Sequence, residues 1–224
     1  MNKLTITAAA AVILAGCASS EPTVQTGPDA EVTFDGLHRV DNSAFAESWA
    51  DPDIDFSRYN KFMAGGAFFE FRAVKKTASS SRVTSSHDEF WIDDASKAKL
   101  EEEVSNVFQE ELAKSERFTE TDAPGPDVIV IRGGLHDIVS RVPPQQVGRH
   151  DIYLSSVGEA TLILEVVDSM SGEVIARAVE RRAAQRAGGQ MVLANTVTTW
   201  TEVRRLARGW ATKLRDGMDS VPTE

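Results

Sequence analysis

The stretch from residue 159 to residue 182 constrains the fold more than any other part of the sequence. Two β-rich runs, EATLILEVVD (159–168) and EVIARAVERR (173–182), flank the short turn SMSG, which ends in Gly172. Two such runs around a glycine-containing turn predict a β-hairpin. Side chains alternate between the faces of a strand, so we expect Arg177 and Arg181 to share a face, opposite Ala176 and Ala178. The chain therefore contains a sheet with antiparallel neighbours.

Two segments carry the 3.6-residue apolar period of amphipathic helices. The first has apolar residues at Leu100, Val104, Val107, Phe108 and Leu112. Asp93 or Asp94 is a suitable N-cap, and the prolines at 124 and 126 prevent continuation. The second has its apolar stripe at Trp200, Val203, Ala207, Trp210, Leu214 and Met218. This helix is rich in arginine and could lie on anionic lipid, but tryptophans on a helical stripe favour packing against the sheet.

Two further segments predict strands. Residues 58–71 are apolar and are interrupted by Gly65-Gly66, which indicates a strand with a bulge. The run VIVI (128–131) predicts a buried strand that can continue to Val139. The order is then β-α-β-β-β-α. It predicts a single α+β domain over residues 34–224, with a mainly antiparallel sheet and two helices on one face. The first helix could also connect parallel neighbours.

The N-terminus predicts export and a lipid anchor. Residues 4–14 carry no charge, but as a helix they would span only about 16 Å, against roughly 30 Å of bilayer hydrocarbon. We therefore expect a signal peptide at 1–16. Leu14, Ala15 and Gly16 precede the only cysteine, Cys17, in the pattern of the bacterial lipobox. Cys17 is thus the expected site of acylation, and two or three acyl chains would hold the protein firmly on a membrane.

The sequence after Cys17 predicts a tether and a location. Residues 17–33 read as the lipidated cysteine and a flexible linker of roughly 20 Å average reach. Ala18 and Ser19 follow the cysteine without an aspartate. That pattern resembles the default of export to the outer membrane, where we expect the domain to face the periplasm.

Composition and motifs argue against several chemistries. A formal net charge of −10 argues against a general nucleic-acid binder. No G-x-S-x-G or P-loop sequence is present. Cys17 is the only cysteine, so none is left to form a disulfide or to complete a metal site with the four histidines. The histidine–aspartate neighbours on strands should point to opposite faces. We therefore predict no catalytic residue, no metal site and no cofactor.

Basic residues gather toward the C-terminal end of the chain. One hypothesis is a partner-binding face formed by Arg177, Arg181, Arg204, Arg205 and Arg208. The alternative is a solvated surface whose arginines form local ion pairs.

Four stretches resemble a family of bacterial lipoproteins, the domain of unknown function 3313. They are FDGL (34–37), DIDFSRYNKF (53–62), DAPGPDVIVIRGGLHDIV (122–139) and GEATLILEVVDSMSGEVIARAVERR (158–182). The resemblance covers nearly the whole mature chain and implies one domain and a lipoprotein. It implies no catalytic residue.

These observations leave two classes of function open. The first is a non-enzymatic binding or adaptor module of the envelope with a protein or glycan partner. A variant of it binds a small hydrophobic molecule, which would require an apolar pocket between helices and sheet. The second is a cell-wall or lipid-directed hydrolase, which would require a deep polar cleft with convergent carboxylates or a histidine.

Overall fold

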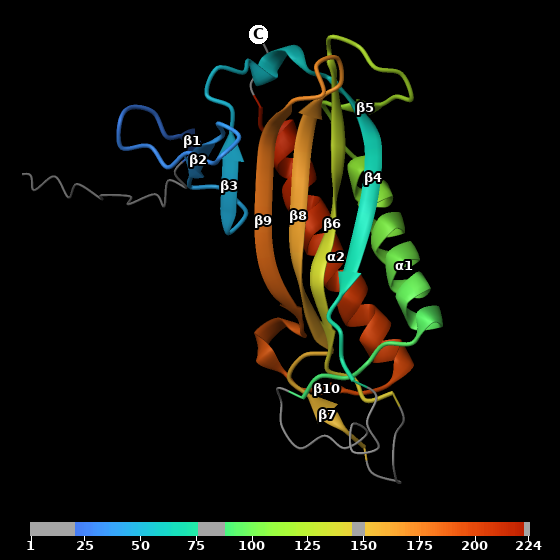
Figure 1. Cartoon of the computed structure of the whole chain (residues 1–224). Coiled ribbons are helices and arrows are strands. Elements are labelled where there is room, and N and C mark those ends of the chain that lie inside the picture. Colours follow the sequence, from blue (N-terminus) through green and yellow to red (C-terminus); the bar gives the residue numbers. More distant parts are fainter. Residues whose placement is uncertain (1–20, 76–87, 145–150, 222–224) are drawn as a thin grey trace, which may run out of the picture.

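The computed structural model describes residues 21–75, 88–144 and 151–221 (Figure 1). Leu14, Ala15, Gly16 and Cys17 lie outside the described residues. One sheet of eight strands has the order β1-β2-β3-β9-β8-β6-β4-β5. Its strands are β1 (Thr23–Val24), β2 (His38–Asp41), β3 (Glu47–Ala50), β4 (Lys61–Phe71), β5 (Thr119–Glu120), β6 (Val128–Ser140), β8 (Gly158–Asp168) and β9 (Val174–Ala184).

Among the described residues, the remaining elements are two helices, two short 3-10 turns and a small second sheet. The helices are α1 (Asp94–Leu112) and α2 (Thr196–Asp219), and the 3-10 turns span Phe56–Arg58 and Ala187–Gly189. The second sheet pairs β7 (Tyr153–Leu154) with β10 (Val192–Leu193). Neither helix in the described part of the chain is long and apolar enough to cross a membrane.

The sheet is mainly antiparallel, as expected. β4 pairs in parallel with β6 and with β5, and the other neighbours in the eight-stranded sheet are antiparallel. Helix α1 lies in the connection between β4 and its parallel neighbour β6, and a parallel pair requires such a crossover connection. Both helices pack on one face of the sheet and leave the other face open (Figure 1). The α+β class with one domain is therefore confirmed, and several short strands are added to the predicted order.

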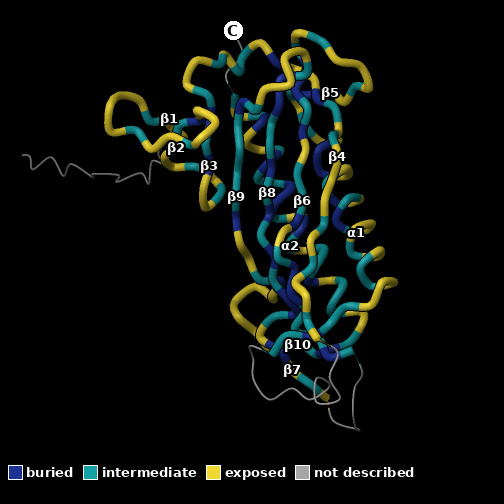
Figure 2. Tube along the Cα trace, in the orientation of Figure 1, coloured by how far each residue is buried: buried dark blue, intermediate teal, exposed yellow. Residues whose placement is uncertain are grey.

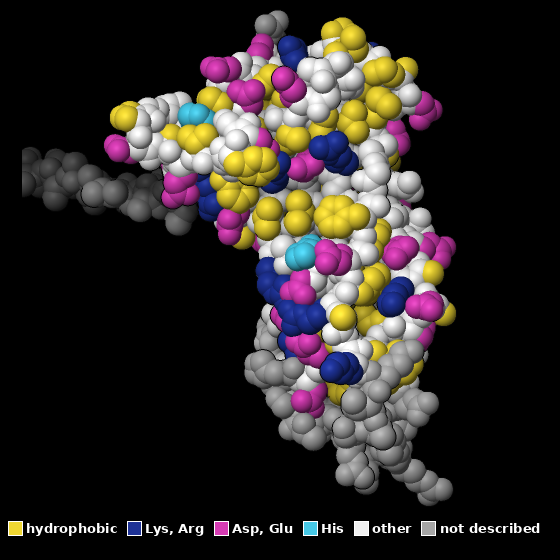
Figure 3. All heavy atoms as spheres, in the orientation of Figure 1, with side chains coloured by type: hydrophobic (Ala, Val, Ile, Leu, Met, Phe, Trp, Pro, Cys, Tyr) yellow, Lys and Arg dark blue, Asp and Glu magenta, His cyan; other side chains and the backbone are white. Residues whose placement is uncertain are grey.

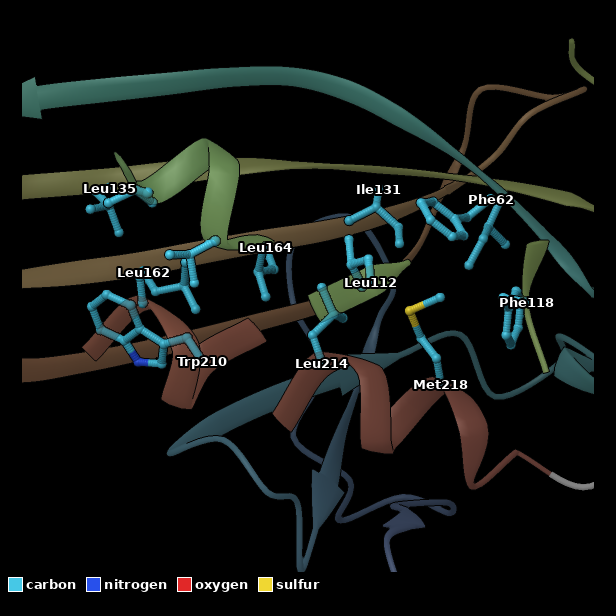
Figure 4. Close-up of a cluster of buried hydrophobic side chains, with 14 of the residues drawn as sticks. Phe62, Leu112, Phe118, Ile131, Leu135, Leu162, Leu164, Trp210, Leu214 and Met218 are labelled. Carbon is cyan, nitrogen blue, oxygen red and sulfur yellow. The ribbon is translucent and has the colours of Figure 1, made fainter. Parts of the chain in front are cut away.

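The core lies between the sheet and the helices. Leu162 and Leu164 of β8 face Trp210 and Leu214 of α2, and α1 adds Leu112 (Figure 4). Figure 2 shows the buried residues concentrated on the strands and the facing sides of the helices. The apolar stripe of α2 thus packs against the sheet, as its tryptophans suggested.

The predicted hairpin and bulge are both present. β8 and β9 pair antiparallel, and Gly172 in the turn between them has φ +76°, a conformation that glycine adopts without a Cβ penalty. The register of β4 against β6 shifts between Ala64 and Ala67, at the glycine pair.

The tether prediction is wrong for residues 21–33. Thr23 and Val24 pair with Asp41 and Val40 of β2, although this segment has no apolar alternation to indicate a strand. The backbone N–H of Gln25 donates to the carbonyl of Arg39 (2.8 Å). These residues therefore belong to the edge of the sheet, and the folded domain begins before residue 34.

Candidate functional site: an apolar cavity between the helices and the sheet

A cavity of about 440 Å³ lies between the N-terminal halves of both helices and the sheet. Its walls come from α1, α2, the C-terminal half of β6 and the facing ends of β8 and β9. The segment before α2 and the Pro143-Pro144 pair border it at the end near β7 and β10. The volume falls in the range of small-molecule sites.

Apolar side chains form most of the wall. Leu100 and Val104 project from α1, and Leu135 and Val139 from β6. Three of the four tryptophans of the chain, Trp91, Trp200 and Trp210, also line the cavity. The sequence indicated the last two as core residues and gave no role to Trp91, which lies two residues before the α1 cap. Trp200 and Trp210 lie on one stripe of α2, and the packing of the helices on the sheet brings Trp91 to the same cavity.

Both helices begin at this cavity. Asp93 caps α1 by accepting hydrogen bonds from the Ser96 backbone N–H (2.7 Å) and its hydroxyl (3.1 Å). The bond from the Ser96 N–H holds the pKa of Asp93 below its ordinary value. Asn195 caps α2 by accepting from the Thr198 N–H (2.8 Å). Each cap satisfies a backbone donor that the helix itself leaves free.

Trp210 lines the cavity, and its indole N–H is buried and unsatisfied. The Trp210 side chain is only 1% exposed, and its Nε1 has no hydrogen-bond partner in the described structure. A buried N–H without an acceptor is rare in folded proteins and costs stability.

Glu159 also borders the cavity, but its carboxylate lies toward the open face of the sheet. It accepts from Arg141 (2.8 Å) and pairs with Arg181 (3.1 Å). Neither Asp93 nor Glu159 is thus left as a free base. No lysine or arginine is among the described residues of the wall.

The arrangement suits binding of an apolar molecule. In the described part of the chain, no group of three or more histidine, cysteine or acidic residues could hold a metal ion. The hydrolase hypothesis required a polar cleft with convergent carboxylates, and this cavity has an apolar wall instead. It therefore gives that hypothesis no support.

The five arginines proposed as one face lie on two sides of the molecule. Arg177 and Arg181 lie on the open face of the sheet, where Arg177 pairs with Asp35 (2.6 Å) and Arg181 with Asp137 (2.9 Å). Acidic and basic side chains are interspersed on this face (Figure 3).

The other three arginines lie on α2, on the opposite side of the sheet. Arg204 pairs with Glu103 (2.9 Å), Arg205 with Glu202 (2.7 Å) and Arg208 with Glu111 (3.2 Å). The prediction of a single arginine face is therefore wrong, because the sheet separates its members. The ion pairs match the alternative of local pairing.

The expectation that strand neighbours point apart is wrong at His136 and Asp137. A register shift follows His136, and Asp137 has φ +54°. His136 Nδ1 lies 2.5 Å from Glu70, while Asp137 accepts from Arg72 (2.7 Å) on the same open face. A bulge places consecutive side chains on one side.

Comparison with known proteins adds a family. Residues 30–214 match the family described as protein of unknown function (DUF3313). The chain belongs to this family. No curated protein shows significant similarity to the sequence.

Several solved structures resemble the fold at low identity. The PelC dodecamer from Paraburkholderia phytofirmans is 11% identical, covers 72% of this chain and 95% of its own, and gives a TM-score of 0.31. A DUF330 protein from Xanthomonas campestris is 12% identical, covers 74% and 86%, and gives 0.36. A putative neuraminyllactose-binding hemagglutinin homolog from Helicobacter pylori is 7% identical, covers 75% and 89%, and gives 0.36.

Proposed function

We propose that this chain is a non-enzymatic binding module of the bacterial envelope that holds a small apolar molecule in the cavity between α1, α2 and the sheet. The cavity carries the proposal, because it is the apolar pocket that this function requires. Burial of apolar surface would drive binding, and few polar groups would orient the ligand.

We further propose that acylation of Cys17 anchors the module to the outer membrane, with the domain in the periplasm. The lipobox residues Leu14, Ala15 and Gly16 support this. An anchored cavity would meet envelope lipids and other apolar molecules at high local concentration. Additional contacts with an envelope protein or glycan are part of the proposal.

Binding is tested with an uncharged naphthylamine dye whose emission rises in apolar surroundings. The core clusters are formed by residues between Phe45 and Met218, so a chain from Ala18 to Glu224 contains the complete core and avoids detergent. We expect a saturable rise in emission at one dye per chain. No rise would contradict the proposed function.

A matched pair of variants locates the dye. Thr199 lines the cavity, whereas Thr201 does not, and each hydroxyl donates to the carbonyl four residues earlier (2.8 Å). Thr199→Phe should fill part of the cavity and weaken dye binding at least tenfold, while Thr201→Phe should leave it unchanged. Equal effects would place the dye elsewhere.

The anchor is tested in cells by Cys17→Ala. We expect loss of labelled palmitate from the protein and loss of the protein from the outer-membrane fraction. Retention in that fraction would contradict anchoring through Cys17. Crosslinking in the same two strains tests for a protein or glycan partner whose contact depends on the anchor.

A further inference from the structure

Phe34 is an aromatic side chain that the described fold leaves in water. It is 98% exposed, whereas Leu37, at the other end of the same turn, is only 2% exposed. Val32, two residues before Phe34, is 52% exposed. Burial of an apolar side chain stabilises a folded protein, so Phe34 contributes almost nothing to this fold. Phe34 and Val32 are therefore apolar surface that is available for a contact outside the domain.

A structured turn holds Phe34 in this position. The Gly36 N–H donates to the Thr33 carbonyl (3.1 Å), and the Thr33 hydroxyl donates to Asp35 (2.6 Å). Asp35 in turn accepts from Arg177 of β9 (2.6 Å), which ties the turn to the sheet. Because the turn is already ordered, a contact at Phe34 would lose little conformational entropy.

The turn belongs to an N-terminal lobe, which is formed by β1, β2 and the connection between them. Thr23 is paired with Asp41, and Val32 is bridged to His38. His38 and Asp41 are the two ends of β2, a distance of roughly 10 Å. Figure 1 shows β1 and β2 toward one end of the eight-stranded sheet, with β7 and β10 at the other end. The segment that leads back toward Cys17 therefore starts close to the exposed turn.

The link from this lobe to the proposed acylation site is short. Residues 18–20 are the whole sequence between Cys17 and Glu21, and a link of this length spans roughly 14 Å at most. A lipid on Cys17 would therefore hold the lobe near the bilayer surface. A short link also gives a high effective concentration of lipid around the lobe, so a weak apolar contact there becomes significant.

The charges of the lobe indicate which bilayer surface it can approach. Residues 21–37 include Glu21, Asp29, Glu31 and Asp35 and contain no lysine or arginine. An anionic lipid surface attracts basic segments and would repel this one. A zwitterionic surface carries no net charge, so apolar contact can decide the interaction there.

We propose that Phe34 and Val32 insert into the interfacial region of a zwitterionic phospholipid bilayer, as a second attachment beside the acylated Cys17. This inference rests on the anchoring in the proposed function and adds a protein surface to it. Acylation alone fixes one point of the chain, whereas a second contact also fixes how the domain is oriented on the membrane.

Depth-dependent quenching tests the insertion. The full chain, acylated in cells, is added to phosphatidylcholine vesicles. Acylation blocks the Cys17 thiol and the sequence has no other cysteine, so Val32→Cys or Val197→Cys supplies one free thiol for a nitrobenzoxadiazole label. Val197 is also exposed, but it lies at the start of α2, which follows β10. We expect nitroxide-labelled acyl chains to quench the label at position 32 by about twofold or more and to leave the label at position 197 unquenched.

A matched pair of substitutions assigns the insertion to Phe34. Phe34→Ser should reduce quenching of the label at position 32 by about twofold or more, because it removes the larger apolar contact. Met191→Ser changes an exposed apolar side chain beside β10 and should leave the quenching unchanged. Replacing part of the phosphatidylcholine by phosphatidylglycerol should lower the quenching, because the lobe is acidic. Circular dichroism verifies that each variant is folded.

Sedimentation with the vesicles separates this inference from the anchor. Sedimentation with an unquenched label at position 32 would overturn the insertion of Phe34 and leave the anchor standing. Equal quenching at positions 32 and 197, quenching that survives Phe34→Ser, or stronger quenching with phosphatidylglycerol would also overturn the insertion. Failure of the chain to be acylated or to sediment with the vesicles would overturn both.

Discussion

Asp168, at the end of β8, joins the hairpin turn to the segment before β4. Its carboxylate accepts from the Tyr59 hydroxyl (2.7 Å), from Arg58 (2.8 Å) and from the backbone N–H groups of Met170 (2.9 Å) and Ser171 (2.7 Å). The side chain is buried. Asp168 thus accepts the backbone hydrogen bonds of the turn and joins the turn to residues more than 100 positions away in the sequence.

Asp168→Asn should destabilise the domain by about 2 kcal/mol at pH 7, because it removes a buried, multiply bonded carboxylate. Burial alone would raise the pKa of Asp168, but the hydrogen bonds from Tyr59 and from the Ser171 and Met170 N–H groups lower it to about 2. The folded pKa is below the ordinary 3.8, so this stabilisation is present above pH 4 and is lost as pH falls toward 2.

Urea unfolding followed by circular dichroism at several pH values measures this difference. The difference in the free energy of unfolding between wild type and Asp168→Asn should become smaller from pH 4 to pH 2. The exposed Asp122→Asn serves as control and should change stability by less than about 0.5 kcal/mol. A gap independent of pH would contradict the assigned role.

Among the elements, the parallel pair β4–β6 depends on close backbone approach. A Cβ at Gly134 would lie 1.9 Å from the Phe68 carbonyl oxygen, whereas a Cβ at Gly66 would meet nothing within 4 Å. The two glycines therefore have different reasons to be present. Gly134 permits the strands to meet, and Gly66 lies at the register shift of β4.

Gly134→Ala should lower the free energy of unfolding by about 3 kcal/mol or more, since the backbone must move to admit the methyl group. Gly66→Ala should change it by less than about 1 kcal/mol, because its Cβ has space and alanine reduces the freedom of the unfolded chain. Thermal and urea unfolding of both variants measures the contrast. Equal losses would contradict the close approach at Gly134.

At the scale of the whole molecule, the N-terminal segment folds onto the sheet edge. His38 Nδ1 lies 2.7 Å from the Gln25 carbonyl oxygen, and the Arg39 N–H donates to the carbonyl of Glu31 (2.9 Å). Only residues 18–20 separate Cys17 from Glu21. If Cys17 is acylated as proposed, a spacer of roughly 14 Å at most would join the lipid to Glu21.

A chain that begins at Phe34, the boundary expected from the sequence, should be less stable than one that begins at Glu21. The loss of β1 and of its bonds to β2 should cost about 2 kcal/mol and lower the melting temperature by about 4–8 °C. Scanning calorimetry of the two chains measures it. Equal melting temperatures would show that residues 21–33 do not stabilise the domain.

The sequence by itself determined the long elements and the class of the fold. Period-two runs around Gly172 and the 3.6-residue stripes through Leu100 and Trp210 depend on local backbone geometry and on one apolar face per element, so they can be read along the chain. The tryptophans of the α2 stripe indicated that this stripe is buried against the sheet. The family resemblance and the absence of recognisable catalytic motifs also came from the sequence.

The tertiary structure decided the site and the surroundings of the charges. Trp200 and Trp210 share the apolar stripe of α2, which the sequence indicates, but only the packing of the helices on the sheet brings Trp91 to the same cavity. The expected arginine face is divided because β9 and α2 lie on different layers, and its members form ion pairs with residues far apart in the chain, such as Arg177–Asp35. The β1 strand and the bulge at Asp137 are fixed by backbone pairing with other strands, so no apolar pattern along the chain indicates them. Local periodicity specifies elements, and only the packing of distant segments creates the cavity between them.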